Sequence, residues 1–186
     1  MKRKSAATVS GAIVVASGIG LMVLRYFAGS ADAPEGWFAA IGFWAPFVGA
    51  GLLAVVGANG HNPALCLGAG IALWPLYVVS VVLVPLLVPA TIMIWVGVTN
   101  APRARDLWLA ELLGAALVVV FGFLLFHQDP ATWTTATGFR SSSNIVTTIE
   151  ALVSVVTVVL VVGLALLWTR QRRGIERQPD PQPDIA

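Results

Sequence analysis

A run of thirty-seven residues without a charged side chain, from Pro63 to Thr99, constrains this chain more than any other feature. As one continuous helix it would be roughly 55 Å long, at about 1.5 Å per residue, whereas the hydrocarbon core of a bilayer is about 30 Å thick. The run is therefore too long for one simple crossing and short for two. The number of its crossings decides on which side of a membrane every later loop lies.

Composition assigns the chain to the integral membrane proteins. Of its 186 residues, 58% are hydrophobic and only 11% are charged, which is outside the usual range of a soluble domain. The net charge of +2 comes from basic clusters beside apolar segments, a pattern typical of topology signals and of contacts with lipid headgroups. We therefore expect an all-α, compact polytopic helical bundle in the lipid bilayer, without a nucleic-acid partner.

Short polar links divide the chain into apolar segments and leave no room for a soluble domain. Residues 1–168 are expected to form a single transmembrane helical domain. Residues 169–186 carry four arginines and then alternate proline with glutamine and aspartate, which predicts a basic, then proline-rich and disordered cytoplasmic tail. The predicted segments are 6–28, 37–57, 63–81, 84–99, 107–126 and 145–168.

The first segment follows three basic residues at positions 2–4 and allows two interpretations. The small-x-small sequence at 31–33 matches a cleavage site of a secretory signal peptide. The apolar region is longer than such peptides require, and Arg25 interrupts its end, so we favour a retained signal-anchor helix. Gly11 and Gly18 lie on one face of this helix and should allow another helix to approach closely.

Charge counting compares the two interpretations of the long run, because basic residues bias a loop to the cytoplasmic side. Arg25 lies within a segment and is left out of both counts. If residues 63–99 cross twice and the N-terminus is inside, nine basic residues are cytoplasmic and Arg140 is outside. If they cross once, four are inside and six are outside. The count favours six segments in a cell membrane, with both termini in the cytoplasm. The alternative is five segments, with one long tilted helix that places Trp74 and Trp95 at opposite interfaces.

The predicted hairpin has an unusual turn, near residues 82–89. These residues are wholly apolar and include Pro85 and Pro89, whereas an exposed turn normally contains Gly, Asn, Asp or Ser. Backbone groups freed by a turn at membrane depth need partners, so protein must cover it. Two short tilted crossings and a re-entrant hairpin both satisfy these conditions.

A polar stripe runs down the outer half of the last predicted segment. Charged groups inside a bilayer are rare, since each costs about 2.5 kcal/mol or more at mid-depth, so Glu150 needs a physical reason. It could line a polar pathway, or it could belong to a hydroxyl-bearing packing face. Arg25 is predicted at the same outer depth and is the candidate partner of Glu150 in an intramembrane ion pair; the alternative is that Arg25 extends to the headgroups. The stripe consists of Ser143, Thr147, Glu150, Ser154 and Thr157.

Glu111 is a candidate inner carboxylate, about one turn into the fifth segment. It could act with Glu150 in a proton relay, as carboxylates do in transporters. It could equally be a carboxylate near a helix N-terminus, favoured by the macrodipole and by the arginines at 103 and 105.

The sequence contains no recognisable catalytic or cofactor-binding constellation. Cys66 is the only cysteine, and His61 and His127 are the only histidines, too few for the usual metal or haem sites. A Ser/His/Asp set is formally available in the outer link, but its composition makes such a set common by chance. We therefore expect no enzyme activity, no metal and no cofactor.

Two functional hypotheses follow from this pattern. The first is a non-enzymatic accessory, assembly or anchoring subunit of a larger membrane complex, with other membrane proteins as partners. Its candidate contact loop is the outer link that contains Trp133, Phe139 and Arg140. The alternative is a small channel or transporter for a proton, an ion or a small solute, which would use the Glu150 stripe.

Overall fold

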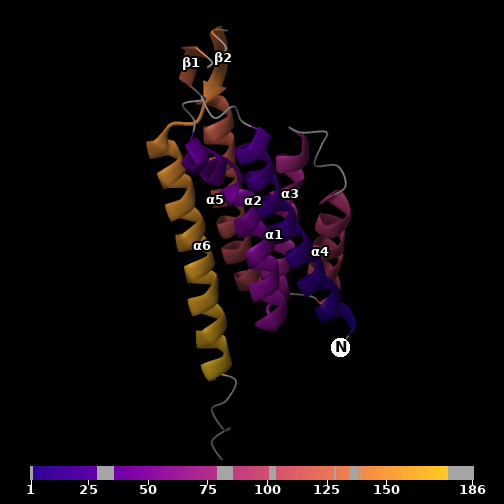
Figure 1. Ribbon diagram of the computed structural model, residues 1–186. Helices are drawn as coiled ribbons and strands as arrows, with labels where there is room; N and C mark the ends of the chain where they lie inside the picture. The colour runs from indigo at the N-terminus through magenta and orange to yellow at the C-terminus, as the bar shows by residue number, and fades with distance from the viewer. Residues whose placement is uncertain are drawn as a thin grey trace, which may run out of the picture.

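The computed structural model describes residues 2–28, 36–78, 86–100, 104–127, 129–134, 138 and 140–175 (Figure 1). These residues form six helices and one two-stranded hairpin. Four of the helices are long and apolar enough to cross a membrane, and two apolar helices are shorter. The predicted all-α helical bundle is therefore confirmed, and its four long apolar helices are compatible with a membrane protein. The helices are α1 (Lys2–Ala28), α2 (Gly36–Asn59), α3 (Pro63–Val78), α4 (Leu87–Thr99), α5 (Ala104–Phe126) and α6 (Thr148–Ile175).

The helices alternate in direction along one axis, so the start of α1 and the end of α6 lie at the same end of the bundle (Figure 1). We call this the basic end, because it holds Lys2, Arg3 and Lys4 in the first turn of α1 and the arginines of the last turns of α6. The turn between α2 and α3 lies there too. The opposite end carries the β-hairpin and is called the hairpin end.

The charge-free run forms two helices, not one. Gly70 of α3 lies against Ile94 of α4, and Gly97 of α4 against Leu67, so the two helices pack antiparallel. α3 begins at Pro63. Backbone N–H groups in the first turn of a helix have no acceptor within the helix, so a proline there costs no helical hydrogen bond. The single long helix over 63–99 is thus wrong. The predicted turn lies mostly outside the described residues, which end at Val78 and resume at Leu86.

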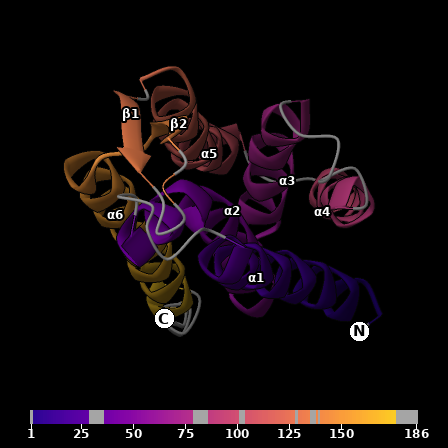
Figure 2. The ribbon, with the colours of Figure 1, turned by 45° about the horizontal axis from the view of Figure 1, so that its top comes forward.

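α2 is the central helix and packs against α1, α3, α5 and α6 (Figure 2). The predicted close approach to α1 is confirmed at Gly11, where an added Cβ would lie 2.8 Å from the carbonyl oxygen of Gly51. Both glycines are needed, since a side chain on either would force the backbones apart. On the other side of the core, the rings of Phe43 and Phe47 both contact Phe121 of α5.

The outer link contains secondary structure that was not predicted. β1 (Asp129–Thr134) and β2 (Arg140–Ile145) pair antiparallel, from Asp129 opposite Ile145 to Thr134 opposite Arg140, and project beyond the helices (Figure 1). Gly138, between the strands, has a φ of 82°, a conformation that glycine adopts without strain. Thr, Trp and Ile favour strands, but the serine-rich second strand lacks the apolar alternation that would identify it.

The last helix differs from its predicted bounds at both ends. It starts at Thr148, three residues later than predicted, and continues to Ile175, seven residues into the predicted tail. Arg172 and Arg173 lie in its last turn, where their positive charges are favoured by the helix dipole. Residues 176–186 lie outside the described part of the chain.

Candidate functional site

The best-defined polar contact inside the bundle joins α6 to α2. Pro46 lies within α2 and has no N–H to donate, so the carbonyl of Gly42, four residues earlier, loses its helical hydrogen bond. The Ser154 hydroxyl donates a hydrogen bond of 2.7 Å to that same carbonyl oxygen, and Ser154 is fully buried. A membrane helix tolerates proline when a neighbouring Ser or Thr satisfies the freed backbone group. Ser154 is therefore a packing residue with a specific acceptor.

Two glycines of α2, Gly42 and Gly49, allow α2 and α6 to approach closely. We call this interface between the two helices the seam. A Cβ on Gly42 would overlap the backbone of Ala151, and one on Gly49 would lie 3.0 Å from Val158. The two helices run in the same direction, since Gly42 meets Ala151 and Gly49 meets Val158 with a constant offset. These close contacts make the α2–α6 interface around Ser154 a packed one.

Glu150 caps its own helix. Its Oε2 accepts a hydrogen bond of 2.7 Å from the Thr147 backbone N–H, and the Thr147 Oγ1 accepts one of 3.3 Å from the Glu150 N–H. This reciprocal pair is a capping box. The sequence Thr-x-x-Glu at 147–150 is its signal, and it was missed because the helix was expected to start near Ile145. Glu150 therefore lies in the first turn of α6.

The remaining members of the stripe are divided between helix and hairpin. Thr157 donates to the carbonyl oxygen of Val153 in its own helix, at 2.8 Å. Ser143 belongs to β2, where it pairs with Ala131, and its side chain lies outside the description. The side chain of Arg25 is likewise outside it, so the ion pair with Glu150 stays a prediction. α1 and α6 both pack on α2, which lies between them (Figure 2).

The basic end contains an ion pair that sequence reasoning missed. Asp106, in the first turn of α5, is buried and forms a salt bridge with Arg172 in the last turn of α6. The Arg172 guanidinium also lies over the Trp168 ring, 5.3 Å from its centroid. Arg173 donates a hydrogen bond of 2.6 Å to the carbonyl oxygen of Asn59, the last residue of α2. These contacts tie the ends of three helices together.

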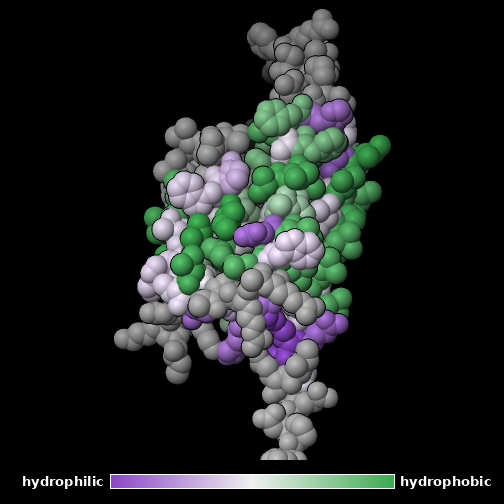
Figure 3. Space-filling view, turned by 180° about the vertical axis from the view of Figure 1, so that it is seen from behind, coloured by the Kyte–Doolittle hydropathy of each residue, from purple (hydrophilic) through white to green (hydrophobic). Residues whose placement is uncertain are grey.

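Glu111 lies on an exposed face of α5. It is five residues beyond Asp106, where the candidate membrane span begins, so it is about 7 Å along the helix axis. Its helical neighbours Trp108, 65% exposed, and Leu112, 52% exposed, also point away from the core. We call Trp108, Glu111, Leu112 and Ala115 the α5 outer face. Seen from behind, the molecule has a hydrophobic band that a small hydrophilic patch interrupts (Figure 3).

The predicted contact loop is only partly described. Trp133 pairs with Ser141 and Arg140 with Thr134 in the hairpin, but the side chains of Trp133 and Arg140 lie outside the description. Phe139 lies outside the described residues altogether. The use of this loop as a contact surface stays a prediction.

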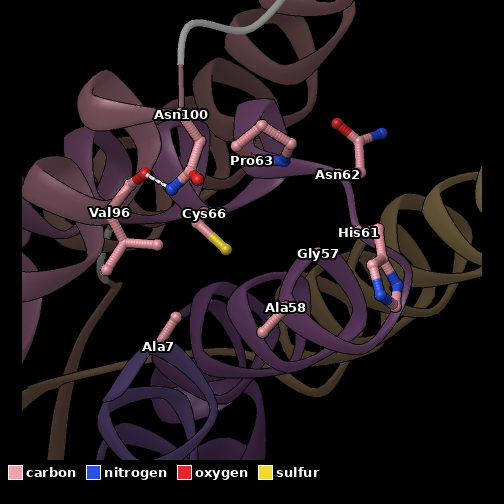
Figure 4. Close-up of a pocket in the computed structure, with 9 residues that line it drawn as sticks. All are labelled: Ala7, Gly57, Ala58, His61, Asn62, Pro63, Cys66, Val96 and Asn100. Atoms are coloured by element: carbon pink, nitrogen blue, oxygen red, sulfur yellow. Dashed lines mark hydrogen bonds between the residues drawn. The ribbon is translucent and has the colours of Figure 1, made fainter. Parts of the chain in front are cut away.

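A cavity of about 260 Å³ opens at the basic end, between α1, α4 and the turn that joins α2 to α3 (Figure 4). Asn62, only 1% exposed, lies at its edge, and both polar atoms of its amide lack a hydrogen-bond partner among the described residues. His61, beside it, has a φ of 59°, which is unusual for a residue with a side chain. Asn100 donates to the Val96 carbonyl oxygen, at 2.6 Å, on the opposite wall. The lining of the cavity thus includes three polar side chains, those of His61, Asn62 and Asn100.

The described residues contain no group of three or more His, Cys, Asp or Glu side chains arranged to hold a metal ion. Comparison of the chain with models of protein families, with curated proteins and with solved structures finds no match. Any functional conclusion must therefore come from the geometry of this molecule.

Proposed function

We propose that this protein is a non-enzymatic accessory, assembly or anchoring subunit of a larger membrane complex, and that the α5 outer face is its contact surface. The observation that carries the proposal is the exposure of Glu111 on a helix of membrane-spanning length. The partner would be a membrane helix that offers a basic side chain at the same depth, so that the contact depends on the charge of Glu111.

Facing lipid costs the Glu111 carboxylate its solvation. A carboxylate that faces lipid at mid-depth costs about 2.5 kcal/mol or more, and less where water and headgroups are within reach. A partner helix lowers this cost by supplying a hydrogen bond or an opposite charge, as intramembrane carboxylates usually require. Trp108 and Leu112 would supply apolar contact area around that polar group.

The competing proposal, a small channel or transporter, draws less support from the stripe that suggested it. Glu150 is engaged in its capping box, and Ser154 is bonded to the Gly42 carbonyl. Freeing either group for an ion would open a helix terminus or the seam between α2 and α6. These contacts favour a static packing role for the outer half of α6.

We further propose six crossings of a cell membrane, with the basic end in the cytoplasm. Support comes from the distribution of charge, because the first turn of α1 and the last turns of α6 are both basic and lie at one end (Figure 1). α3 and α4 are about 24 Å and 20 Å long by helical rise, so they would cross as a short, locally thinned pair.

The test is to purify the complex in mild detergent and to reconstitute the isolated chain in liposomes. Wild-type protein should migrate as a defined complex larger than the chain alone, and Glu111→Gln should dissociate it. Glu150→Gln, the same chemical change on another helix, is the matched control and should leave the complex intact. The isolated chain should give no ion or solute flux.

A flux in liposomes that Glu150→Gln abolishes would establish the carrier hypothesis instead. A complex that survives Glu111→Gln would remove the α5 outer face as the contact surface and leave the outer hairpin as the candidate.

A further inference from the structure

A second hollow lies on the side of the bundle, between α1 and α4. It is a groove of about 650 Å³, and its lining includes Val9 and Ile13 of α1 and Val88 and Ile92 of α4. Val9 is 57% exposed and Val88 is 64% exposed, so the side chains of the bundle leave its walls open. Along α1 the lining extends from Ser5 to Ile13, which corresponds to about 12 Å of helix.

One end of this groove adjoins polar and charged chemistry. Ser5 follows directly on Lys2, Arg3 and Lys4, which form the first turn of α1. The cavity of Figure 4 lies next to it, since that cavity is lined by Ala7 and Val96, and Ile92 of the groove packs against the same small cluster. An apolar groove therefore begins at a cationic helix end.

We infer that this groove binds an anionic phospholipid, with one acyl chain between α1 and α4 and the phosphate at the basic first turn of α1. The inference is independent of the partner surface on α5, which is a different face of the bundle. Two features select the ligand: the apolar walls require a hydrocarbon chain, and the cationic end favours a negative headgroup over a zwitterionic one.

A lipid in this position would do more than coat the surface. α4 is a short helix that packs against α3 and, more sparsely, against α1. An acyl chain lying between α1 and α4 would contact the exposed apolar side chains of both helices and hold α4 against the bundle. Bound anionic lipid should therefore stabilise the folded protein, since a ligand that binds only the folded state shifts the unfolding equilibrium.

The test measures lipid binding to the purified full-length chain in detergent, by native mass spectrometry and by thermal unfolding. The probes are dioleoyl-phosphatidylglycerol, dioleoyl-phosphatidylcholine and the soluble headgroup glycerol 3-phosphate. Phosphatidylglycerol should be retained as a single bound lipid and should raise the melting temperature. Phosphatidylcholine should be retained less and should raise the melting temperature less. Glycerol 3-phosphate should have no effect because it lacks an acyl chain.

Variants separate the groove from general lipid contact. Val9→Trp and Val88→Trp fill the groove from opposite walls at exposed positions, and each should weaken phosphatidylglycerol binding about tenfold by displacing methylene groups of the chain. Val23→Trp, at an exposed site of α1 outside the groove, is the matched control. Replacing Lys2, Arg3 and Lys4 by glutamine should remove the preference for the anionic lipid, whereas Arg170→Gln should not.

Unchanged phosphatidylglycerol binding in both folded groove variants would overturn the inference, as would equal affinity of the wild-type chain for the two phospholipids. A second copy of the chain in the groove would also overturn it, and would appear as a dimer that Val9→Trp disrupts.

Discussion

Ser154 on α6 donates its hydrogen bond to the carbonyl oxygen of Gly42 on α2, the acceptor that Pro46 leaves without a helical partner. One residue breaks a backbone hydrogen bond, and a residue more than a hundred positions later restores it. The contact lies beside the close approach of Gly42 to the backbone of Ala151, so the proline, the glycine and the serine form one structural unit.

Removing the hydroxyl should therefore destabilise the bundle. We expect Ser154→Ala to lower the free energy of unfolding in micelles by about 1–2 kcal/mol, because a buried carbonyl loses its donor. Thr157→Ala is the matched control, since the Thr157 hydroxyl only supplements a helical carbonyl, and should cost less than about 0.5 kcal/mol. In a Pro46→Ala background, an N–H returns at position 46, and the cost of Ser154→Ala should fall by half or more. An equal cost in both backgrounds would contradict this account.

The seam should not accept a side chain at Gly42. Because its Cβ would overlap Ala151, Gly42→Ala should push α2 and α6 apart and cost about 2–3 kcal/mol of unfolding free energy. Gly163→Ala on α6 has open space around the new methyl group, and should be neutral or stabilising by up to about 1 kcal/mol through helix propensity. Thermal unfolding in detergent compares the two, and similar melting temperatures would argue against the close approach.

The capping box predicts a specific order among variants at the start of α6. Thr147→Ala should lower the unfolding free energy by about 1 kcal/mol through loss of the cap. Glu150→Gln should be nearly neutral, because an amide oxygen can still accept the Thr147 N–H, whereas Glu150→Leu should resemble Thr147→Ala. If Glu150→Gln were the most damaging of the three, the charge itself would matter, as in the predicted pair with Arg25.

The ion pair at the basic end should be cooperative. Asp106 is buried and Arg172 is partly exposed, so Asp106→Asn and Arg172→Gln should each cost about 2 kcal/mol, less than a fully buried pair would. The double variant should cost clearly less than the sum, and the difference measures the coupling. Additive losses in unfolding free energy would mean that the two residues act separately.

Sequence and structure agree where long apolar runs decide the outcome. The six helices follow from such runs, and charge counting favoured two segments over 63–99 because the basic residues at 103 and 105 needed an even number of crossings to join the other clusters. The position four residues before Pro46 was also readable as a freed carbonyl. The hydrogen-bond donor to that carbonyl, Ser154, could not be identified from the sequence, because the sequence does not show that α2 and α6 are parallel neighbours.

Other features were missed for local reasons. The serine-rich strand β2 has no alternating apolar pattern, so the hairpin resembled a loop. The start of α6 was placed at Ile145, which hid the Thr147–Glu150 capping box and put Glu150 in the second turn of the helix, whereas it lies in the first. Asp106 and Arg172 meet because the first turn of α5 lies beside the last turn of α6. This arrangement depends on the tertiary fold.

The most direct measurement of the proposed role is photo-crosslinking in intact membranes. A photoreactive residue replacing Leu112 on the α5 outer face should give one discrete protein adduct, identified by mass spectrometry as a membrane protein with a basic residue near the crosslink. The same residue at Leu164, 55% exposed on α6, should give only lipid adducts. Adding Glu111→Gln should abolish the adduct at Leu112. Lipid adducts alone at both positions would contradict the proposal that the α5 outer face binds a partner.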